Sequence, residues 1–223
     1  MGFLVGEVVR RVAGRRLRDV ITEDVARPLD AEFLVGTTPE DDAHTADWLA
    51  YEYQPNEDRN ERRPWMAGDP AQASDRDRMR RLAYGNPSAA GNGVLSRVWS
   101  AAAFPSTNGH SNARIFGTLT RGGTATNGYR LLDPATIEAD ARTYADGEDE
   151  ILGRPTRFGL GFQLTIPGIR PLGPNAGSFG HYGIGFADRT ARLAFAFTCN
   201  QSGRSWRDPC NIALIDALYE GIG

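Results

Sequence analysis

The amino-acid sequence predicts an α+β fold in which a helical region comes first and an antiparallel sheet, covered by a terminal helix, comes last. Apolar residues recur at helical spacing in three stretches of the first part, 3–12, 17–25 and 113–119. Beyond residue 154 they alternate with polar residues, which is typical of strands, and helical spacing returns at 208–222. Helices first, strands later and a final helix together make the α+β pattern.

Two consecutive amphipathic helices are expected at the start of the chain. The apolar residues that repeat every three or four positions are Phe3, Leu4, Val8 and Val12 in the first helix, and Leu17, Val20, Ile21 and Val25 in the second. Gly14 is predicted to end the first helix and Pro28 the second. No capping residue precedes Gly2, as expected for an element entered partway through.

The stretch 36–92 is polar, charged and irregular, and it contains few apolar anchors. Its aromatic residues, Trp48, Tyr51, Tyr53 and Trp65, are unusual in a solvated linker. We therefore expect a long ordered loop with short helices, lying over a cleft. His44 lies in an acidic part of it without a second metal ligand at useful spacing, so a surface or capping histidine is predicted.

Two further helices precede the strands. Ser106 or Asn108 is predicted to cap a helix that ends at 122–123, where two glycines follow one another. Asp133 is expected to cap the next helix, with Pro134 at its first position. The chain would thus consist of a mostly helical region at 1–150, the long polar loop included, and a sheet with its terminal helix at 151–223.

The strands are expected after a glycine- and acid-rich break at 146–154. The stretch "RFGLGFQLTI" predicts one strand, with Phe158, Leu160, Phe162 and Leu164 on one face. The stretches "SFGHYGIGFAD" and "ARLAFAFTCN" predict a hairpin with its turn at 188–190. In "DPCNIALIDALYEGI", Asp208 is the expected cap and Pro209 the first residue of the terminal helix.

Composition narrows the classes of function. The formal net charge is −3, so nucleic acid and anionic membranes are poor expected partners, and a small neutral or weakly charged molecule fits better. All 25 residues counted as Lys + Arg are arginine. Because arginine stays protonated at ordinary pH, no lysine amine can act as a general base or form a Schiff base in this chain.

Neither a cofactor nor a metal is expected. Cys199 and Cys210 are too few for a disulfide scaffold or a zinc site, and they are predicted to be reduced packing residues. No apolar run approaches the roughly 18 residues of a membrane span, and the start lacks the order of a signal peptide. As it stands, the chain is expected to be cytoplasmic, although a signal in a longer precursor would not be visible.

Several residues are weak candidates for a nucleophilic site. The run "AGSFG" resembles a nucleophile elbow around Ser178, but that motif needs a strand, a turn and a helix, whereas strand-like sequence follows Ser178. A serine at a strand entry is the simpler interpretation. The run 106–108 matches an S-x-N motif of penicillin-recognising enzymes, yet a helix cap explains the same residues. His110 beside Asn112 needs no more than a local hydrogen bond.

The run "FGHYGIGFADR" is different in kind. A polar residue flanked by glycines at a strand leaves backbone N–H groups within reach of a ligand, and such groups are good donors to a developing oxyanion. His181 would add a titratable side chain at the mouth of such a site.

Six blocks of sequence carry a family resemblance: "GFLVGEVVRRVAGRRLRDVITEDVARPL", "FPSTNGHSNARIF", "RLLDPATIEA", "RFGLGFQLT", "FGHYG" and "GFADRTARLAFAFTCN". In this order they resemble the C-terminal part of serine β-lactamase-related hydrolases, the class C β-lactamase and esterase branch of the penicillin-binding fold. The resemblance covers most of the chain and is poorest at 40–95. It implies a β-lactamase/transpeptidase-like fold, present as one incomplete domain without its N-terminal part.

The resemblance also implies site residues. The third active-site motif of the family is K-T-G in β-lactamases and commonly H-x-G in the esterase-like branch, which His181, Tyr182 and Gly183 match. By resemblance, Tyr182 faces the substrate cleft and the backbone N–H of Ile184 donates to the oxyanion. Family members usually carry more small residues after this motif. Here only Ile184 separates Gly183 from Gly185, so the hairpin is expected to be short on the substrate side.

The family's nucleophile and base are missing from the chain. They belong to an S-x-x-K motif, which cannot occur without lysine, and to a tyrosine motif that would precede the first helix. The expected function is the C-terminal portion of a serine hydrolase of ester or β-lactam-like amide bonds, acting through an acyl-serine and inactive alone. The alternatives are a non-catalytic protein that binds a small ligand or peptidoglycan fragment, and one half of a split enzyme whose N-terminal half is supplied separately.

Overall fold

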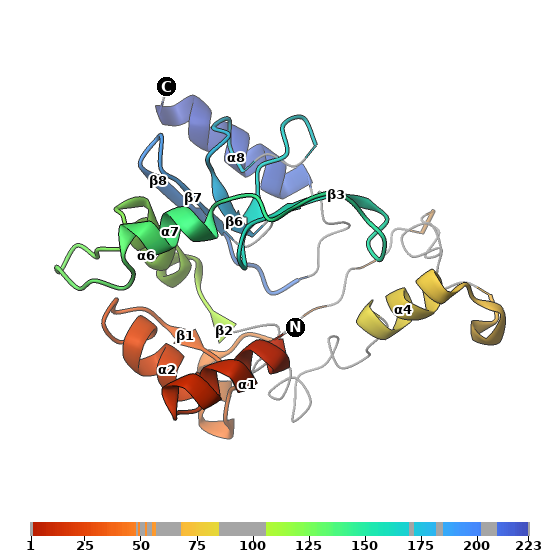
Figure 1. The fold of residues 1–223 in the computed structure, drawn as a ribbon, viewed down its shortest axis with the longest axis horizontal. Coiled ribbons are helices and arrows are strands. Elements are labelled where there is room, and N and C mark those ends of the chain that lie inside the picture. Colours follow the sequence, from red (N-terminus) through yellow and green to blue (C-terminus); the bar gives the residue numbers. More distant parts are fainter. Residues whose placement is uncertain are drawn as a thin grey trace.

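The computed structural model describes residues 2–47, 49, 52, 55–56, 68–84, 106–169, 172–181, 185–201 and 209–222. In Figure 1 the N-terminal helices lie together on one side, the sheet with its flanking helices lies on another, and α4 (Asp75–Tyr84) lies apart from both. This arrangement confirms the predicted α+β class.

The two predicted N-terminal helices are present. Helix α1 (Gly2–Ala13) ends at Gly14, whose φ of 68° is the left-handed conformation that glycine adopts readily at a helix end. Helix α2 (Leu17–Val20) continues directly into η1 (Ile21–Ala26), a π-helix. The two helices meet where Gly6 lies against Leu17, since a Cβ at Gly6 would be 3.2 Å from a methyl carbon of Leu17.

Pro28 ends this helical segment as predicted. A distant loop donates hydrogen bonds to two carbonyl groups at the end of the segment. Proline has no N–H, so the Asp24 carbonyl four residues earlier loses its usual helical donor. The Tyr129 hydroxyl donates to that carbonyl at 3.0 Å, and the Asn127 side chain donates to the Pro28 carbonyl at 2.8 Å. These two bonds tie the N-terminal helices to the part of the chain that carries the sheet.

The irregular stretch at 36–92 does contain short helices. They are η2 (Pro39–His44) and η4 (Pro70–Gln72), both 3₁₀-helices, and α4 (Asp75–Tyr84). His44 ends η2 and is exposed, as predicted for a surface histidine. The four aromatic residues that suggested a loop over a cleft lie outside the described residues.

The next two helices agree with the sequence. Helix α6 (Gly109–Thr120) is capped by Asn108, whose side-chain oxygen accepts from the Ser111 N–H at 2.8 Å. Ser106 is not the cap, because it belongs to β2 (Ser106–Thr107), which pairs with β1 (Phe33–Leu34). Helix α7 (Pro134–Asp140) begins with proline as predicted, and Asp133 holds the N-cap position but its side chain makes no cap hydrogen bond.

Six strands form one antiparallel sheet whose spatial order follows the chain order. They are β3 (Ala145–Asp149), β4 (Arg154–Phe158), β5 (Gln163–Leu164), β6 (Phe179–His181), β7 (Gly185–Asp188) and β8 (Leu193–Ala196). The predicted hairpin turn at 188–190 is confirmed between β7 and β8, but the stretch "SFGHYGIGFAD", predicted as one arm, is two antiparallel strands, β6 and β7.

Two predictions for the first strands are wrong. The expected break at 146–154 is a hairpin in which Ala145 pairs with Phe158 and Asp149 with Arg154. The single strand predicted for "RFGLGFQLTI" is two strands, because Phe158 pairs with Gln163 and the chain turns between them at Gly161, with φ of 82°. Leu160 therefore lies exposed at the turn and does not face the core.

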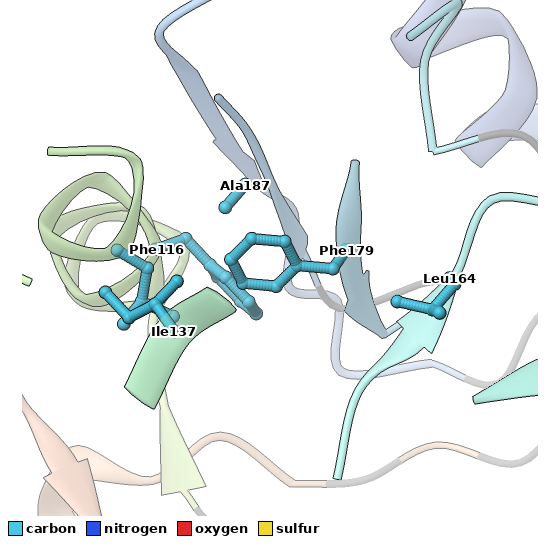
Figure 2. Packing of buried hydrophobic residues seen from close by; sticks show 6 residues of the cluster. Phe116, Ile137, Leu164, Phe179 and Ala187 are labelled. Carbon is cyan, nitrogen blue, oxygen red and sulfur yellow. The ribbon is translucent and has the colours of Figure 1, made fainter. Parts of the chain in front are cut away.

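The sheet is covered on both faces. On one face Phe179 and Ala187 pack with Phe116 of α6 and Ile137 of α7 (Figure 2), together with Leu119 and Leu164. On the other face, Phe186 packs with Leu172 and with Ile215 of α8 (Pro209–Ile222), the terminal helix predicted to cover the sheet. The predicted cap of α8, Asp208, lies outside the described residues.

The prediction for the two cysteines was half wrong. Both are reduced, but both are exposed and neither packs in the core. Cys199 follows the last paired residue of β8, Ala196, and Cys210 lies in the first turn of α8, whose buried side is occupied by Ile215. None of the helices within the described ranges is long and apolar enough to cross a bilayer.

Candidate functional site

His181 is the last residue of β6 and is exposed. It pairs with Gly185, the first residue of β7, so three residues connect the two strands. This short connection agrees with the shortened hairpin expected from the sequence. The other predicted site residues, Tyr182, Gly183 and Ile184, form that connection and lie outside the described residues.

Two glycines allow the strands around His181 to pack closely. A Cβ at Gly180 would lie 2.3 Å from the Gly185 carbonyl oxygen and 2.5 Å from the Phe186 Cα. A Cβ at Gly185 would lie 2.7 Å from the Phe195 carbonyl oxygen and 3.0 Å from the Phe116 ring. Real Cβ atoms do not approach backbone so closely, so packing requires glycine at positions 180 and 185.

The N-terminus of α6 reaches the same end of the sheet as His181. Across the strands His181 pairs with Gly185, and Gly185 pairs with Ala196. Gly109, the first residue of α6, lies against Ala196, because a Cβ there would be 3.4 Å from the Ala196 carbonyl oxygen. The register therefore places the start of α6 about two strand spacings, roughly 10 Å, from His181.

The polar side chains at the start of α6 are occupied by structural hydrogen bonds. Besides capping the helix, Asn108 donates to the Glu32 carboxylate at 2.6 Å. Thr107 donates to the Glu32 carbonyl at 2.7 Å, and the Glu32 N–H donates to the Ser111 hydroxyl at 2.8 Å. Asn108 is thus a helix cap, as the cap interpretation of 106–108 predicted. His110 is exposed next to this network.

A small apolar hollow adjoins His181 on the α8 side of the sheet. It is lined by His181, Leu172, Gly185, Phe186, Phe195, Phe197, Asn211 and Ile215. The hollow lies between the end of the sheet that carries His181 and the first half of α8. Its lining is an extension of the core on that face.

Ser178 has the position predicted for a strand-entry serine. It immediately precedes β6 and is 1% exposed, and strand sequence follows it in place of the helix that a nucleophile elbow needs. His181 is three residue steps further along the strand, about 10 Å at 3.3 Å per residue. The structure does not bring Ser178 and His181 together as nucleophile and base.

A buried network at the opposite end of β6 and β7 was missed by sequence reasoning. Asp188 is completely buried, and its Oδ2 accepts from the Tyr219 hydroxyl at 2.5 Å and from Asn175 at 2.7 Å. Its Oδ1 accepts from the Ala191 N–H at 2.9 Å. Tyr219 has room because Gly173 faces it, where a Cβ would lie 2.3 Å from the hydroxyl oxygen. The network ties α8 to the β7–β8 turn.

Ionisation in this network follows from burial and hydrogen bonding. Burial acts to raise the pKa of Asp188, but the bonds from Tyr219, Ala191 and Asn175 more than offset it, and the net pKa is below the ordinary value. Burial and the bond to the Asp188 carboxylate raise the pKa of Tyr219. Asp188 is thus a buried carboxylate held ionised by its donors, and it lies three residues along β7 from Gly185, the partner of His181.

Within the described ranges, no three His, Cys, Asp or Glu side chains are grouped closely enough to hold a metal ion.

A family model described as Beta-lactamase matches residues 1–219. No curated protein sequence matches the chain significantly. Among solved structures, a novel penicillin-binding protein homologue from Caulobacter crescentus is 28% identical with a TM-score of 0.77, and the alignment covers 98% of this chain and 56% of that one. A family VIII carboxylesterase is also 28% identical, with a TM-score of 0.73 and coverage of 96% and 55%.

EstA from Arthrobacter nitroguajacolicus Rue61a has a TM-score of 0.72 at 20% identity, which supports the fold alone; the coverage is 99% of this chain and 57% of that one. The chain therefore spans little more than half the length of these solved structures. The comparisons confirm the β-lactamase/transpeptidase-like fold that the sequence blocks implied.

Proposed function

Because the chain belongs to the β-lactamase family, we propose that it forms the C-terminal portion of a serine hydrolase that cleaves ester or β-lactam-like amide bonds through an acyl-serine. The observation that carries the proposal is the span of the similarity. The family model matches residues 1–219, yet the two solved structures at 28% identity are covered over 56% and 55% of their length. One is a penicillin-binding protein homologue and the other a carboxylesterase, which supports an amide or ester substrate.

Open surfaces at the sheet support an incomplete domain. Strand β8 is the last strand of the sheet, and its outer edge has no strand partner among the described residues. Natural proteins seldom leave such an edge uncovered, because its N–H and C=O groups are free to pair with another chain. On α8, Leu214 and Ile222 remain 39% and 55% exposed, Leu214 next to the buried Ile215 and Ile222 two turns beyond it at the end of the helix.

The nucleophile and its base are assigned to a part of the enzyme outside this chain. An S-x-x-K motif needs a lysine, and the chain has none. Ser178 does not replace it, since it is buried and lies about three strand residues from His181. The chain alone is therefore inactive towards esters and β-lactams, although backbone donors without a nucleophile leave a weak background rate.

We assign supporting roles to the H-x-G motif. His181 orients the substrate or the nucleophile at the end of β6, where it is exposed and flanked by tightly packed glycines. Tyr182 faces the substrate, Gly183 permits close approach of the backbone, and the N–H of Ile184 stabilises the oxyanion of the tetrahedral intermediate. These groups act on a substrate held by the other portion of the enzyme.

The proposed setting is the cytoplasm. Cys199 and Cys210 are both exposed, and no disulfide joins them. Exposed thiols persist in a reducing compartment, whereas oxidising compartments favour their pairing. The partners are a small ester or β-lactam-like substrate and the N-terminal portion of the fold, joined to this chain or supplied by a separate polypeptide.

The experiment begins with the DNA directly upstream of the Met1 codon, read in all frames. We expect a frame that encodes S-x-x-K and a tyrosine motif. The protein made from that extended frame is then expected to hydrolyse p-nitrophenyl butyrate, and the His181→Ala variant to lose at least about tenfold in kcat/KM, the size of a typical positioning effect. If the extended protein hydrolyses neither this ester nor a chromogenic β-lactam, the proposed function is wrong.

A further inference from the structure

The amphipathic helix α1 exposes its apolar side. Leu4, Val5, Val8 and Val12 are 71%, 50%, 61% and 84% exposed. At 3.6 residues per turn these four positions lie along one stripe of the helix. We call them the α1 stripe. An amphipathic helix normally turns such a stripe towards a core, so a stripe that faces solvent marks an interaction surface.

The rest of α1 shows that the helix is seated by its other side. Gly6 contacts Leu17 of α2, and helical spacing places Gly6 nearly opposite the α1 stripe. Glu7 pairs with Arg10 and Arg11 at 2.7 and 2.8 Å, so the charged side chains of the helix already satisfy one another. Within the described residues, α1 contacts α2 by the side that carries Gly6. The α1 stripe is therefore accessible to a partner outside this chain.

A second copy of the chain is a poor occupant. Four side chains from each copy bury far less than the roughly 800 Å² per partner of a standard stable interface. A larger occupant would contact the stripe and other surfaces at once. The solved structures at 28% identity contain additional polypeptide of this size, because this chain accounts for only 56% and 55% of their length.

We propose that the α1 stripe is the docking surface for an apolar helix of the missing N-terminal portion. The inference rests on the proposed function and adds where the two portions meet. An apolar stripe of Leu and Val residues spaced by four is complementary to another helix with the same spacing, because ridges of such residues fit into one another's grooves at 8–10 Å between helix axes.

The test uses a fusion in which the part of the Caulobacter homologue without a counterpart in this chain precedes Met1. Cys199 and Cys210 are replaced by serine, and Val8→Cys reports on the α1 stripe through its rate of maleimide labelling. Burial under a docked helix is expected to slow that labelling at least about tenfold in the fusion relative to the chain alone, since only an accessible thiolate reacts. The matched control, Arg10→Cys on the opposite side of α1, is expected to label equally in both proteins.

Equal labelling of Val8→Cys in the fusion and in the chain alone would overturn the inference. Treatment of the fusion with a fluorophosphonate separates this outcome from the proposed function. A serine adduct without protection of Val8→Cys contradicts the docking site and leaves the function standing. Protection of Val8→Cys without a serine adduct supports the docking site and contradicts the proposed function.

A second measurement does not depend on the fusion. In the chain alone the stripe contacts solvent, so Leu4→Asp with Val8→Asp is expected to leave the melting temperature unchanged and to reduce binding of the dye ANS. A fall of more than about 5 °C, the shift caused by losing a real packing contact in a domain of this kind, would show that the stripe is already packed within the chain and would overturn the proposal.

Discussion

At the scale of single residues, the packing at the end of β6 depends on Gly180 and Gly185, where a Cβ would clash with neighbouring backbone. Gly180 lies between Phe179, which is completely buried, and His181, which is exposed. A side chain at position 180 would meet the backbone of β7, which belongs to the sheet and cannot move aside as a flexible side chain would. The position of His181 therefore depends on the absence of a Cβ one residue before it.

The variant Gly180→Ala tests this dependence. The added methyl would lie 2.3 Å from the Gly185 carbonyl oxygen, so we expect a loss of about 2 kcal/mol or more in the free energy of unfolding, typical of overpacking. Urea denaturation measures it. The control is Gly177→Ala, where a Cβ would meet nothing within 4 Å. Similar stability of the two variants would contradict the packing described for β6 and β7.

The buried hydroxyl of Tyr219 gives a second prediction at this scale. Tyr219→Phe removes the donor that lies 2.5 Å from Asp188 Oδ2 and leaves that buried carboxylate with fewer partners. A hydrogen bond to a charged group contributes about 1.5–3 kcal/mol, so we expect a loss of that size in thermal or urea unfolding. Tyr144→Phe, at a tyrosine that is 56% exposed, is the control and is expected to change stability little.

Asp188 also predicts a dependence on pH. Its pKa in the folded chain is below the ordinary value, so its contribution to stability is present above about pH 4 and is lost as pH falls through the lower folded value. Asp188→Asn is expected to lower stability at pH 7 and to flatten the decline of stability below about pH 4. Unfolding curves of both proteins across that range measure the difference. A decline of equal steepness in both would contradict the assignment.

The structural role of a residue could be predicted from the sequence where its hydrogen-bond partner is close along the chain. Asn108 caps α6 by accepting from an N–H three residues later, a relation that the sequence itself displays. The Asp188–Tyr219 bond joins residues 31 positions apart, and neither neighbourhood carries a pattern that indicates the other. The exposed cysteines were missed for a related reason: the general tendency of thiols to be buried does not say which side of α8 faces the sheet.

At the scale of elements, helices were easier to predict than the first strands. The helices α1, α6, α7 and α8 each begin or end at a proline, a glycine or a capping residue, so their bounds were close to expectation. The sequence predicts a single strand where the structure has the hairpin of β4 and β5. Alternation continues through Phe158, Leu160 and Phe162, and only the positive φ of Gly161 reverses the chain. When the alternation of apolar and polar residues continues through a turn, the alternation alone cannot show that the chain turns there.

The cap of α6 gives a prediction for that element. Asn108→Ala removes the acceptor for the Ser111 N–H and the donor to Glu32. Loss of an N-cap costs about 1 kcal/mol, and we expect at least that in urea unfolding because the β1–β2 contact is weakened too. His110→Ala, an exposed neighbour in the first turn, is the control, and an effect there as large as that of Asn108→Ala would contradict the cap's role.

At the scale of the whole molecule, three surfaces have the same character. The α1 stripe and the pair Leu214 and Ile222 on α8 are exposed apolar side chains, and the outer edge of β8 has no strand partner within the described ranges. They belong to elements from both ends of the chain (Figure 1). One portion of polypeptide that contributes both helices and strands would cover all three, in agreement with the length of the solved structures that the chain partly matches.

The central claim is that this chain carries the supporting half of a serine hydrolase site and not the nucleophile. The most direct measurement is the intact mass of the chain after incubation with a fluorophosphonate and, separately, with a chromogenic β-lactam. The account predicts an unchanged mass in both cases, because the chain has no lysine to activate a serine and Ser178 is buried. A stoichiometric adduct on any serine of residues 1–223 would contradict it.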